Sequence, residues 1–140
     1  MQTKTTIDYQ GPEEDVQSIE IPLRVPSYMV RHDVQRIIIE YRQDYRRMQA
    51  DHEAKVAYCR ATPDGYPALD ECIAAAEVAY GDALVERLRQ YEWSCFDAIV
   101  DYRALPADMA ALVRSTSWRE TCDFDAVTAM LTSFRGRLRC

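Results

Sequence analysis

His32 and His52 are the only histidines among the 140 residues of this sequence, and they limit the metal and acid-base chemistry open to it. A carboxylate-bridged metal pair between long helices needs a glutamate three residues before a histidine on two helices. Met29 and Gln49 occupy those positions here, which excludes such a site. We expect His52 to be a packed histidine that hydrogen-bonds to a tyrosine or a carboxylate. A small enzyme centred on His52 ranks as the third of three functional hypotheses.

Five cysteines lie far apart in the sequence, at positions 59, 72, 95, 122 and 140. No two have the spacing of metal ligands, and the odd, scattered set is unlike a disulfide framework. Cys59 and Cys72 flank an expected turn, but we interpret both as small hydrophobic residues of the core. There is no glycine-rich phosphate loop, which excludes the common nucleotide-binding motifs. We therefore expect no cofactor, no metal and a reducing, cytoplasmic setting.

The basic residues are 15 Arg and only 2 Lys, a bias that suggests a bacterium or a phage-infected host cell as the source. The N-terminus has no signal-peptide pattern, and no apolar run approaches the roughly 18 residues of a membrane span. A net charge of -6 argues against direct binding of nucleic acid or of an anionic membrane. We expect the partner to be a protein.

Acidic residues concentrate between positions 67 and 105, where eight acids and three bases give a net charge of -5. At about 100° per residue, four carboxylates share the helix side opposite the apolar face, and Trp93 falls among them. A tryptophan at a position predicted to face solvent is either covered by another part of the chain or an anchor for a partner. The predicted partner-binding residues are Asp82, Glu86, Trp93, Asp97 and Asp101.

Two long apolar stripes predict the helices that carry these residues. The first runs from Val30 to Cys59 with spacings of three and four, and Ser27 is its expected N-cap. The second runs from Tyr80 to Tyr102, with Val78 and Val85 widening its apolar arc. The turn-prone segment 62–67 separates them, so the two helices are expected to be antiparallel neighbours.

The flanking segments are shorter. Ile19, Ile21, Leu23 and Val25 alternate with other residues, which predicts a strand or extended arm with one buried face, paired with Thr3 to Tyr9. Pro106 ends the second long helix, and a short helix is expected over 107–114. A last helix begins near Asp123, on the apolar stripe formed by Val127, Met130, Leu131, Phe134 and Leu138.

The sequence thus predicts a mainly α fold in a single domain over 1–140. It consists of an N-terminal extended arm or β-hairpin over 1–26, a long antiparallel helical hairpin over 27–105 and two shorter helices over 106–140. The length suits one core.

The first functional hypothesis is a non-enzymatic inhibitor that occludes a protein partner through the acidic helical face. Imitation of nucleic acid, to block a nucleic-acid-binding complex, is one version of it. Size and charge suit phage anti-defence proteins such as anti-CRISPRs, or toxin-immunity proteins, as an analogy without a motif. The alternative is a structural homodimer or assembly subunit that uses the arm residues Ile19, Ile21, Leu23 and Val25 as its contact.

Overall fold

The computed structural model describes residues 4–62 and 68–138, and its contacts group into two compact units. One unit consists of Met1–Val34 and Ser94–Cys140 and is called the mixed unit here. The other, Gln35–Trp93, is called the two-helix unit. Helices α1 (Tyr28–Ala61) and α2 (Ala68–Ile99) each contribute to both. We expected a single domain, which stays a prediction; the boundary between the two contact groups falls within the two longest helices.

The mixed unit begins with an antiparallel β-hairpin of β1 (Lys4–Gln10) and β2 (Val16–Pro22), with Ile7 opposite Ile19. The expected alternation is confirmed as far as Leu23, because Ile19, Ile21 and Leu23 are all buried. The strand itself starts and ends three residues earlier than the expected segment from Ile19 to Val25. Part of the predicted partner strand, Thr3, lies outside the described residues.

The chain leaves β2 by pairing with the end of α2. The Arg24 N–H donates to the Ile99 carbonyl at 2.8 Å, and the Asp101 N–H donates to the Pro22 carbonyl at 2.9 Å. These two bonds explain why α2 ends at Ile99 and not at Leu105 as expected, although Tyr102 keeps the helical spacing of the apolar stripe. A 3-10 turn, η1 (Tyr102–Ala104), follows.

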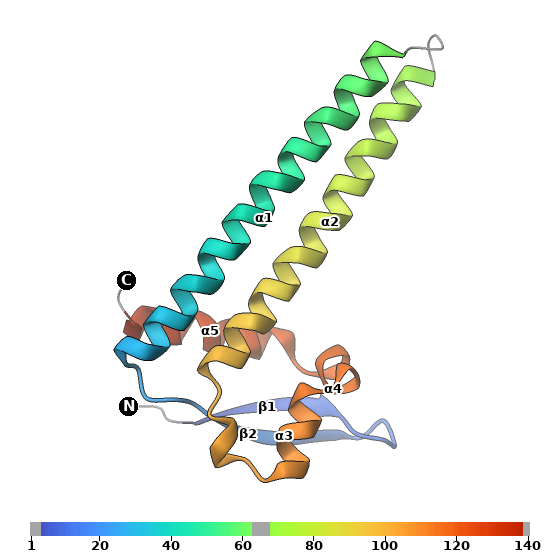
Figure 1. Ribbon diagram of the computed structural model, residues 1–140. Helices are drawn as coiled ribbons and strands as arrows, with labels where there is room; N and C mark the ends of the chain where they lie inside the picture. The colour runs from blue at the N-terminus through green and yellow to red at the C-terminus, as the bar shows by residue number, and fades with distance from the viewer. Residues whose placement is uncertain (1–3, 63–67, 139–140) are drawn as a thin grey trace. The chain divides into compact units, whose positions relative to one another are not determined.

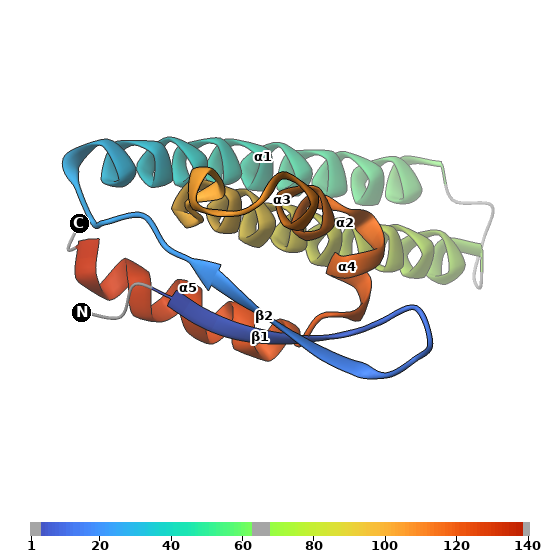
Figure 2. The ribbon, with the colours of Figure 1, turned by 90° about the horizontal axis from the view of Figure 1, so that it is seen from below.

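Three helices complete the mixed unit. They are α3 (Ala107–Arg114), α4 (Thr116–Thr121) and α5 (Phe124–Leu138). The bounds of α3 are those predicted, whereas α4 was not expected. Both α4 and α5 contact β1, and α5 runs alongside the hairpin (Figures 1 and 2). The predicted stripe of α5 is confirmed, since all five of its residues are buried.

The core of the mixed unit centres on Trp118 of α4, which is 1% exposed. Its ring centroid lies 6.0 Å from that of Phe96 and 6.3 Å from that of Tyr9, in tilted arrangements that favour aromatic contact. Ser115 caps α4, because its hydroxyl accepts a hydrogen bond from the backbone N–H of Trp118 at 3.2 Å. The cap fixes the first turn of α4, from which the Trp118 ring extends into the core.

The two-helix unit consists of α1 from Gln35 to its end, beside the antiparallel α2 as far as Trp93 (Figure 1). The ring centroids of Tyr41 on α1 and Tyr91 on α2 lie 4.6 Å apart. Arg87 of α2 also links the two helices, because its guanidinium bonds Asp44 at 2.8 Å and lies 5.5 Å from the Tyr41 ring. Ser27 caps α1 as predicted, accepting from the Val30 N–H at 3.3 Å. Of the segment 62–67, where a turn is expected, residues 63–67 lie outside the described residues.

Candidate functional site

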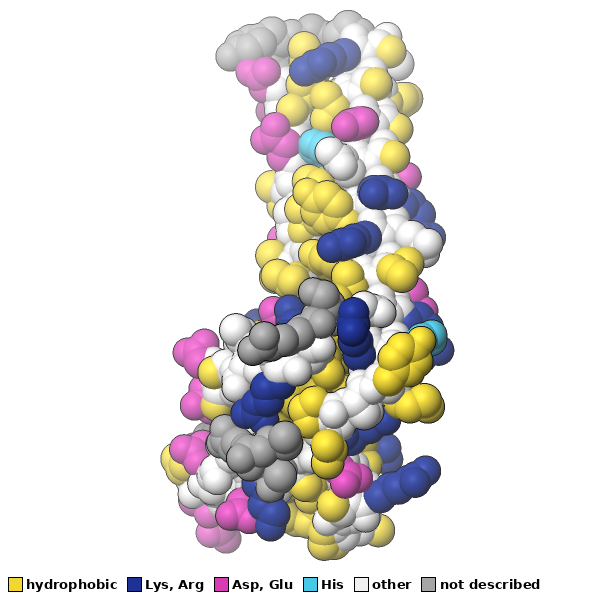
Figure 3. Space-filling view, turned by 90° about the vertical axis from the view of Figure 1, so that its left-hand side faces the viewer, with side chains coloured by type: hydrophobic (Ala, Val, Ile, Leu, Met, Phe, Trp, Pro, Cys, Tyr) yellow, Lys and Arg dark blue, Asp and Glu magenta, His cyan; other side chains and the backbone are white. Residues whose placement is uncertain are grey.

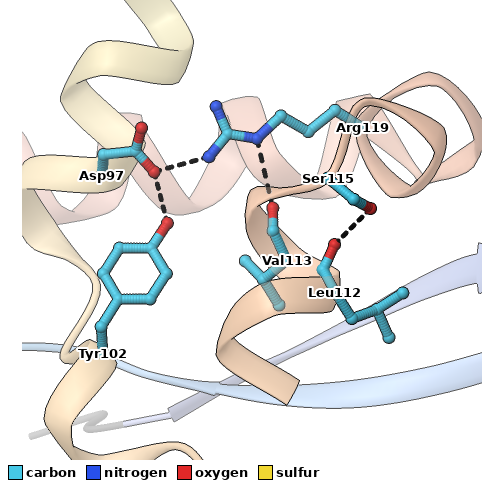
Figure 4. Close-up of polar contacts among 6 residues, drawn as sticks. All are labelled: Asp97, Tyr102, Leu112, Val113, Ser115 and Arg119. Carbon is cyan, nitrogen blue, oxygen red and sulfur yellow. Dashed lines mark hydrogen bonds and ion pairs between the residues drawn. The ribbon is translucent and has the colours of Figure 1, made fainter. Parts of the chain in front are cut away.

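Asp97, one of the predicted partner-binding residues, is engaged within the mixed unit. It accepts a hydrogen bond from the Arg119 guanidinium at 2.6 Å and another from the Tyr102 hydroxyl (Figure 4). Arg119 also donates from Nε to the Val113 carbonyl at 3.2 Å. One carboxylate therefore joins the end of α2 to η1 and to α4, and a partner would have to compete with these bonds.

Tyr102 is held in its protonated form by the same contact. Burial of the ring, and then the hydrogen bond to Asp97, raise the pKa of Tyr102 well above its ordinary value of 10.0. Its hydroxyl is therefore a hydrogen-bond donor throughout the physiological range.

The other predicted residues have different surroundings. Asp82 and Glu86 are exposed on α2 in the two-helix unit. Trp93 is half-buried and interacts with other groups of the chain. Asp101 is half-buried in the mixed unit. The four carboxylates are thus divided between the two units, and only Asp82 and Glu86 are exposed without a hydrogen bond or ion pair among the described residues.

The N-terminal contact residues are turned inward. Ile19, Ile21 and Leu23 are 3%, 0% and 8% exposed, because the β-hairpin packs against helices of its own chain. Val25 alone of the four is exposed. Pairing of this segment with a second copy stays a prediction, with Val25 as the exposed member of the four.

A row of exposed apolar residues lies on α2, and it includes two valines that were expected to be buried. Val78 and Val85, expected to widen the buried arc, are 64% and 65% exposed, and Leu88 is 44% exposed. With the exposed small residues Ala74 and Gly81 they have spacings of four, three, four and three. At about 100° per residue these five residues occupy an arc of about 80°. We call this row of Ala74, Val78, Gly81, Val85 and Leu88 the α2 seam.

Spacing of this kind is typical of a helix that packs against another helix in a coiled coil. A pattern search could have found the seam, because its spacings of four and three alternate and give a repeat of seven residues. In the space-filling view, hydrophobic side chains also reach the surface between charged ones elsewhere on the two-helix unit (Figure 3).

His52 stacks on Tyr80, with ring centroids 4.4 Å apart and planes inclined by 20°. Its buried Nδ1 atom has no hydrogen-bond partner among the described residues. The expected hydrogen bond to a tyrosine or carboxylate is therefore replaced at Nδ1 by a ring contact. A small cavity of about 90 Å³ adjoins the pair and is also lined by Asp51 and Lys55.

Cys59 and Cys72 form a disulfide, which corrects our interpretation of both as unpaired core residues. The reason is geometric: the last turn of α1 faces the first turns of α2, and the two Cα atoms come within 5.8 Å. This pairing removes the argument for a reducing compartment that we drew from the scattered cysteines. Cys95 is buried.

Within residues 4–62 and 68–138, no three His, Cys, Asp or Glu side chains are grouped so that they could hold a metal ion. In the same part of the chain, no helix is both long enough and apolar enough to span a bilayer.

No protein-family model matches this chain, and searches of curated proteins and of solved structures find no significant similarity.

Proposed function

We propose that the protein is a non-enzymatic binding protein whose partner docks along the α2 seam. The observation that carries the proposal is the exposure of Val78 and Val85, at 64% and 65%, on one face of a long helix. Contiguous exposed apolar residues on a small protein are typical of an interaction surface. Between them, Gly81 has open space where a side chain would stand, which lets a partner backbone approach closely.

The charge around the seam defines the chemistry of the partner. Residues 68–93 contain six acidic and two basic residues, a net charge of -4. Glu77 lies on one side of the seam, and Asp82 and Glu86 lie on the other; all three are exposed. The partner that fits is an amphipathic helix whose apolar stripe is flanked by Lys or Arg.

This proposal keeps a protein as the partner but moves the docking surface from the acidic face of α2 to the α2 seam. Imitation of a nucleic-acid backbone would need a row of available carboxylates, and Asp97 is held by Arg119 and Tyr102. An inhibitor that occludes a helix of its target is consistent with the seam, and it needs only Asp82 and Glu86 from the original row.

A second copy of the chain is the second candidate partner, and the charge difference between the long helices favours it. Residues 35–61 of α1 contain six basic and four acidic residues, a net charge of +2. They also expose Ile39 and Tyr45, at 54% and 40%. In a twofold dimer the basic α1 of each copy would lie beside the acidic α2 of the other.

Site-specific photocrosslinking tests the proposal. A photoreactive residue at position 85 is compared with the same residue at position 39, an exposed apolar position on the other long helix. In a lysate of the source cells we expect a discrete heterologous adduct from position 85 and none from position 39. Equal adducts from both positions would contradict the proposal.

Light scattering coupled to size-exclusion chromatography separates the two candidates. A monomeric mass at micromolar concentration supports a different protein as partner. A dimeric mass that reverts to monomer in a Val78→Ser/Val85→Ser variant, but not in Val16→Ser at an exposed position of β2, identifies the second copy.

A further inference from the structure

One cavity is lined by described residues of the mixed unit, whereas the α2 seam belongs to the two-helix unit. Its volume is about 670 Å³, within the range of small-molecule sites. Segments far apart in the sequence form its wall: the chain after β2, the first turn of α1, η1 and the last residue of α3. The cavity is independent of the surface that carries the proposed function.

Three arginines line this cavity in a protein whose net charge is -6. Arg24 is already engaged, since it bonds Asp33 at 3.3 Å and the Ala98 carbonyl at 2.9 Å. Arg103 and Arg114 are exposed and form no ion pair within the described residues. Two guanidinium groups therefore remain available for an anion.

Arg114 is also held in place. Its guanidinium carbon lies 3.9 Å from the centroid of the Tyr102 ring, a cation-π contact. Tyr102 is fixed in turn by its hydrogen bond to Asp97, which Arg119 holds from the other side (Figure 4). A guanidinium positioned before the ligand arrives loses less conformational entropy on binding.

The first turn of α1 adds a further positive contribution. Ser27 and Val30 line the cavity, and the Ser27 hydroxyl satisfies the Val30 N–H. The preceding amides of a first helical turn have no partner within the helix, and the helix dipole favours an anion near them. This 34-residue helix therefore presents its positive end to the wall that also carries the arginines.

Among the described residues that line the cavity, Asp101 is the one acid. A carboxylate among arginines opposes a purely anionic ligand but accepts hydrogen bonds from hydroxyl groups. Val30 and Val100 supply an apolar wall for carbon atoms. The combination fits a molecule with a phosphate at one end and hydroxyl groups at the other.

We propose that this cavity binds a small sugar phosphate. Arg103, Arg114 and the start of α1 hold the phosphate, and Asp101 accepts hydrogen bonds from the sugar hydroxyls. Planar guanidinium groups suit this role because they match the spacing of phosphate oxygens.

Isothermal titration calorimetry at low ionic strength tests the site with ribose phosphate, inorganic phosphate and free ribose as probes. We expect ribose phosphate to bind more tightly than inorganic phosphate, and free ribose to give no heat. Binding of free ribose as tight as that of ribose phosphate, or no heat from ribose phosphate at millimolar concentration, would overturn the proposal.

Matched variants locate the binding. Arg103→Gln/Arg114→Gln should weaken ribose phosphate at least about tenfold, and Arg42→Gln, an exposed arginine of the two-helix unit, should leave it unchanged. Arg103→Gln alone, at an exposed residue of η1, should weaken binding without disturbing the contact of Arg114 with Tyr102. Asp101→Asn should weaken ribose phosphate and spare inorganic phosphate. Unchanged affinity in the double arginine variant would rule out this cavity as the site.

Discussion

Arg119 of α4 holds Asp97 of α2 through a hydrogen-bonded ion pair of 2.6 Å, although 22 residues separate them in the sequence. The Arg119 side chain is 19% exposed, so most of its surface is covered. Its guanidinium also lies 5.8 Å from the Phe96 ring. The ion pair thus joins α4 to the end of α2 beside Phe96 of the aromatic core, and Asp97 also positions Tyr102 beside the proposed phosphate site.

Asp97→Ala should lower the free energy of unfolding by about 1–2 kcal/mol, because Arg119 and the Tyr102 hydroxyl both lose their acceptor. The figure is at the low end for a charged pair because Asp97 is 43% exposed and water screens the interaction. Urea unfolding of the variant measures the change, with Glu40→Ala, an exposed acid of α1, as control. A loss no larger than that of the control would show that the pair contributes no stability.

Tyr102 should make the protein less stable at alkaline pH. Its pKa is raised in the folded state, so folding favours the protonated hydroxyl. That stability is fully present below the unfolded pKa of about 10 and is lost as the pH rises toward the folded value. Unfolding free energies measured from neutral pH to about pH 11 should fall less steeply in Tyr102→Phe than in the parent protein. Parallel curves would contradict the assignment.

Several helices could be predicted because residues at their ends or along their buried faces mark where they lie in the sequence. Pro106 marks the start of α3, and the stripe from Val127 to Leu138 defines α5. The sequence could not reveal α4, because six residues are too few for a helical period to stand out. Nor could it place the end of α2, since Tyr102 continues the spacing while hydrogen bonds to Pro22 and from Arg24 stop the helix at Ile99.

The candidate site was harder to predict than the fold. Asp97 was expected to face solvent, and periodicity contains no information about Arg119, its partner from another helix. Val78 and Val85 were assigned to a buried arc because apolar residues next to an apolar stripe usually pack. In the structure α1 covers only one side of α2 in this unit, so the second apolar row remains exposed. The sequence of one helix cannot show which of its faces is buried, because burial depends on the other elements that pack against it.

The disulfide should stabilise the two-helix unit. Cys59 and Cys72 are 13 residues apart, and closing a loop of that size contributes about 2–3 kcal/mol, mainly by restricting the unfolded chain. Cys59→Ser/Cys72→Ser should lower the free energy of unfolding by that amount. A reductant should reduce the stability of the parent protein to a similar level and leave the double variant unaffected. A parent protein insensitive to reductant would contradict the bond.

His52→Phe should keep or raise stability by up to about 1 kcal/mol, since phenylalanine preserves the stack on Tyr80 and removes a buried nitrogen that lacks a partner. His52→Ala is the matched control and should destabilise, because it removes the ring itself. Thermal unfolding of both variants gives the comparison. A marked loss in His52→Phe would reveal that the imidazole has a polar role, which is what the hypothesis of an enzyme centred on His52 requires.

Gly81→Ala separates the stability of the chain from its proposed binding function. A Cβ atom at this helical position would meet nothing within 4 Å, so the variant should gain about 0.5–1 kcal/mol from reduced backbone entropy in the unfolded state. A partner helix seated on the α2 seam would meet that same methyl group at the point of close approach. We therefore expect higher thermal stability together with weaker photocrosslinking from position 85.

The control for substitution on α2 is Ala79→Ser, at an exposed small residue outside the α2 seam. If Gly81→Ala is stabilised and crosslinks as well as the parent, the partner does not approach the helix at Gly81, and the seam is not its docking surface.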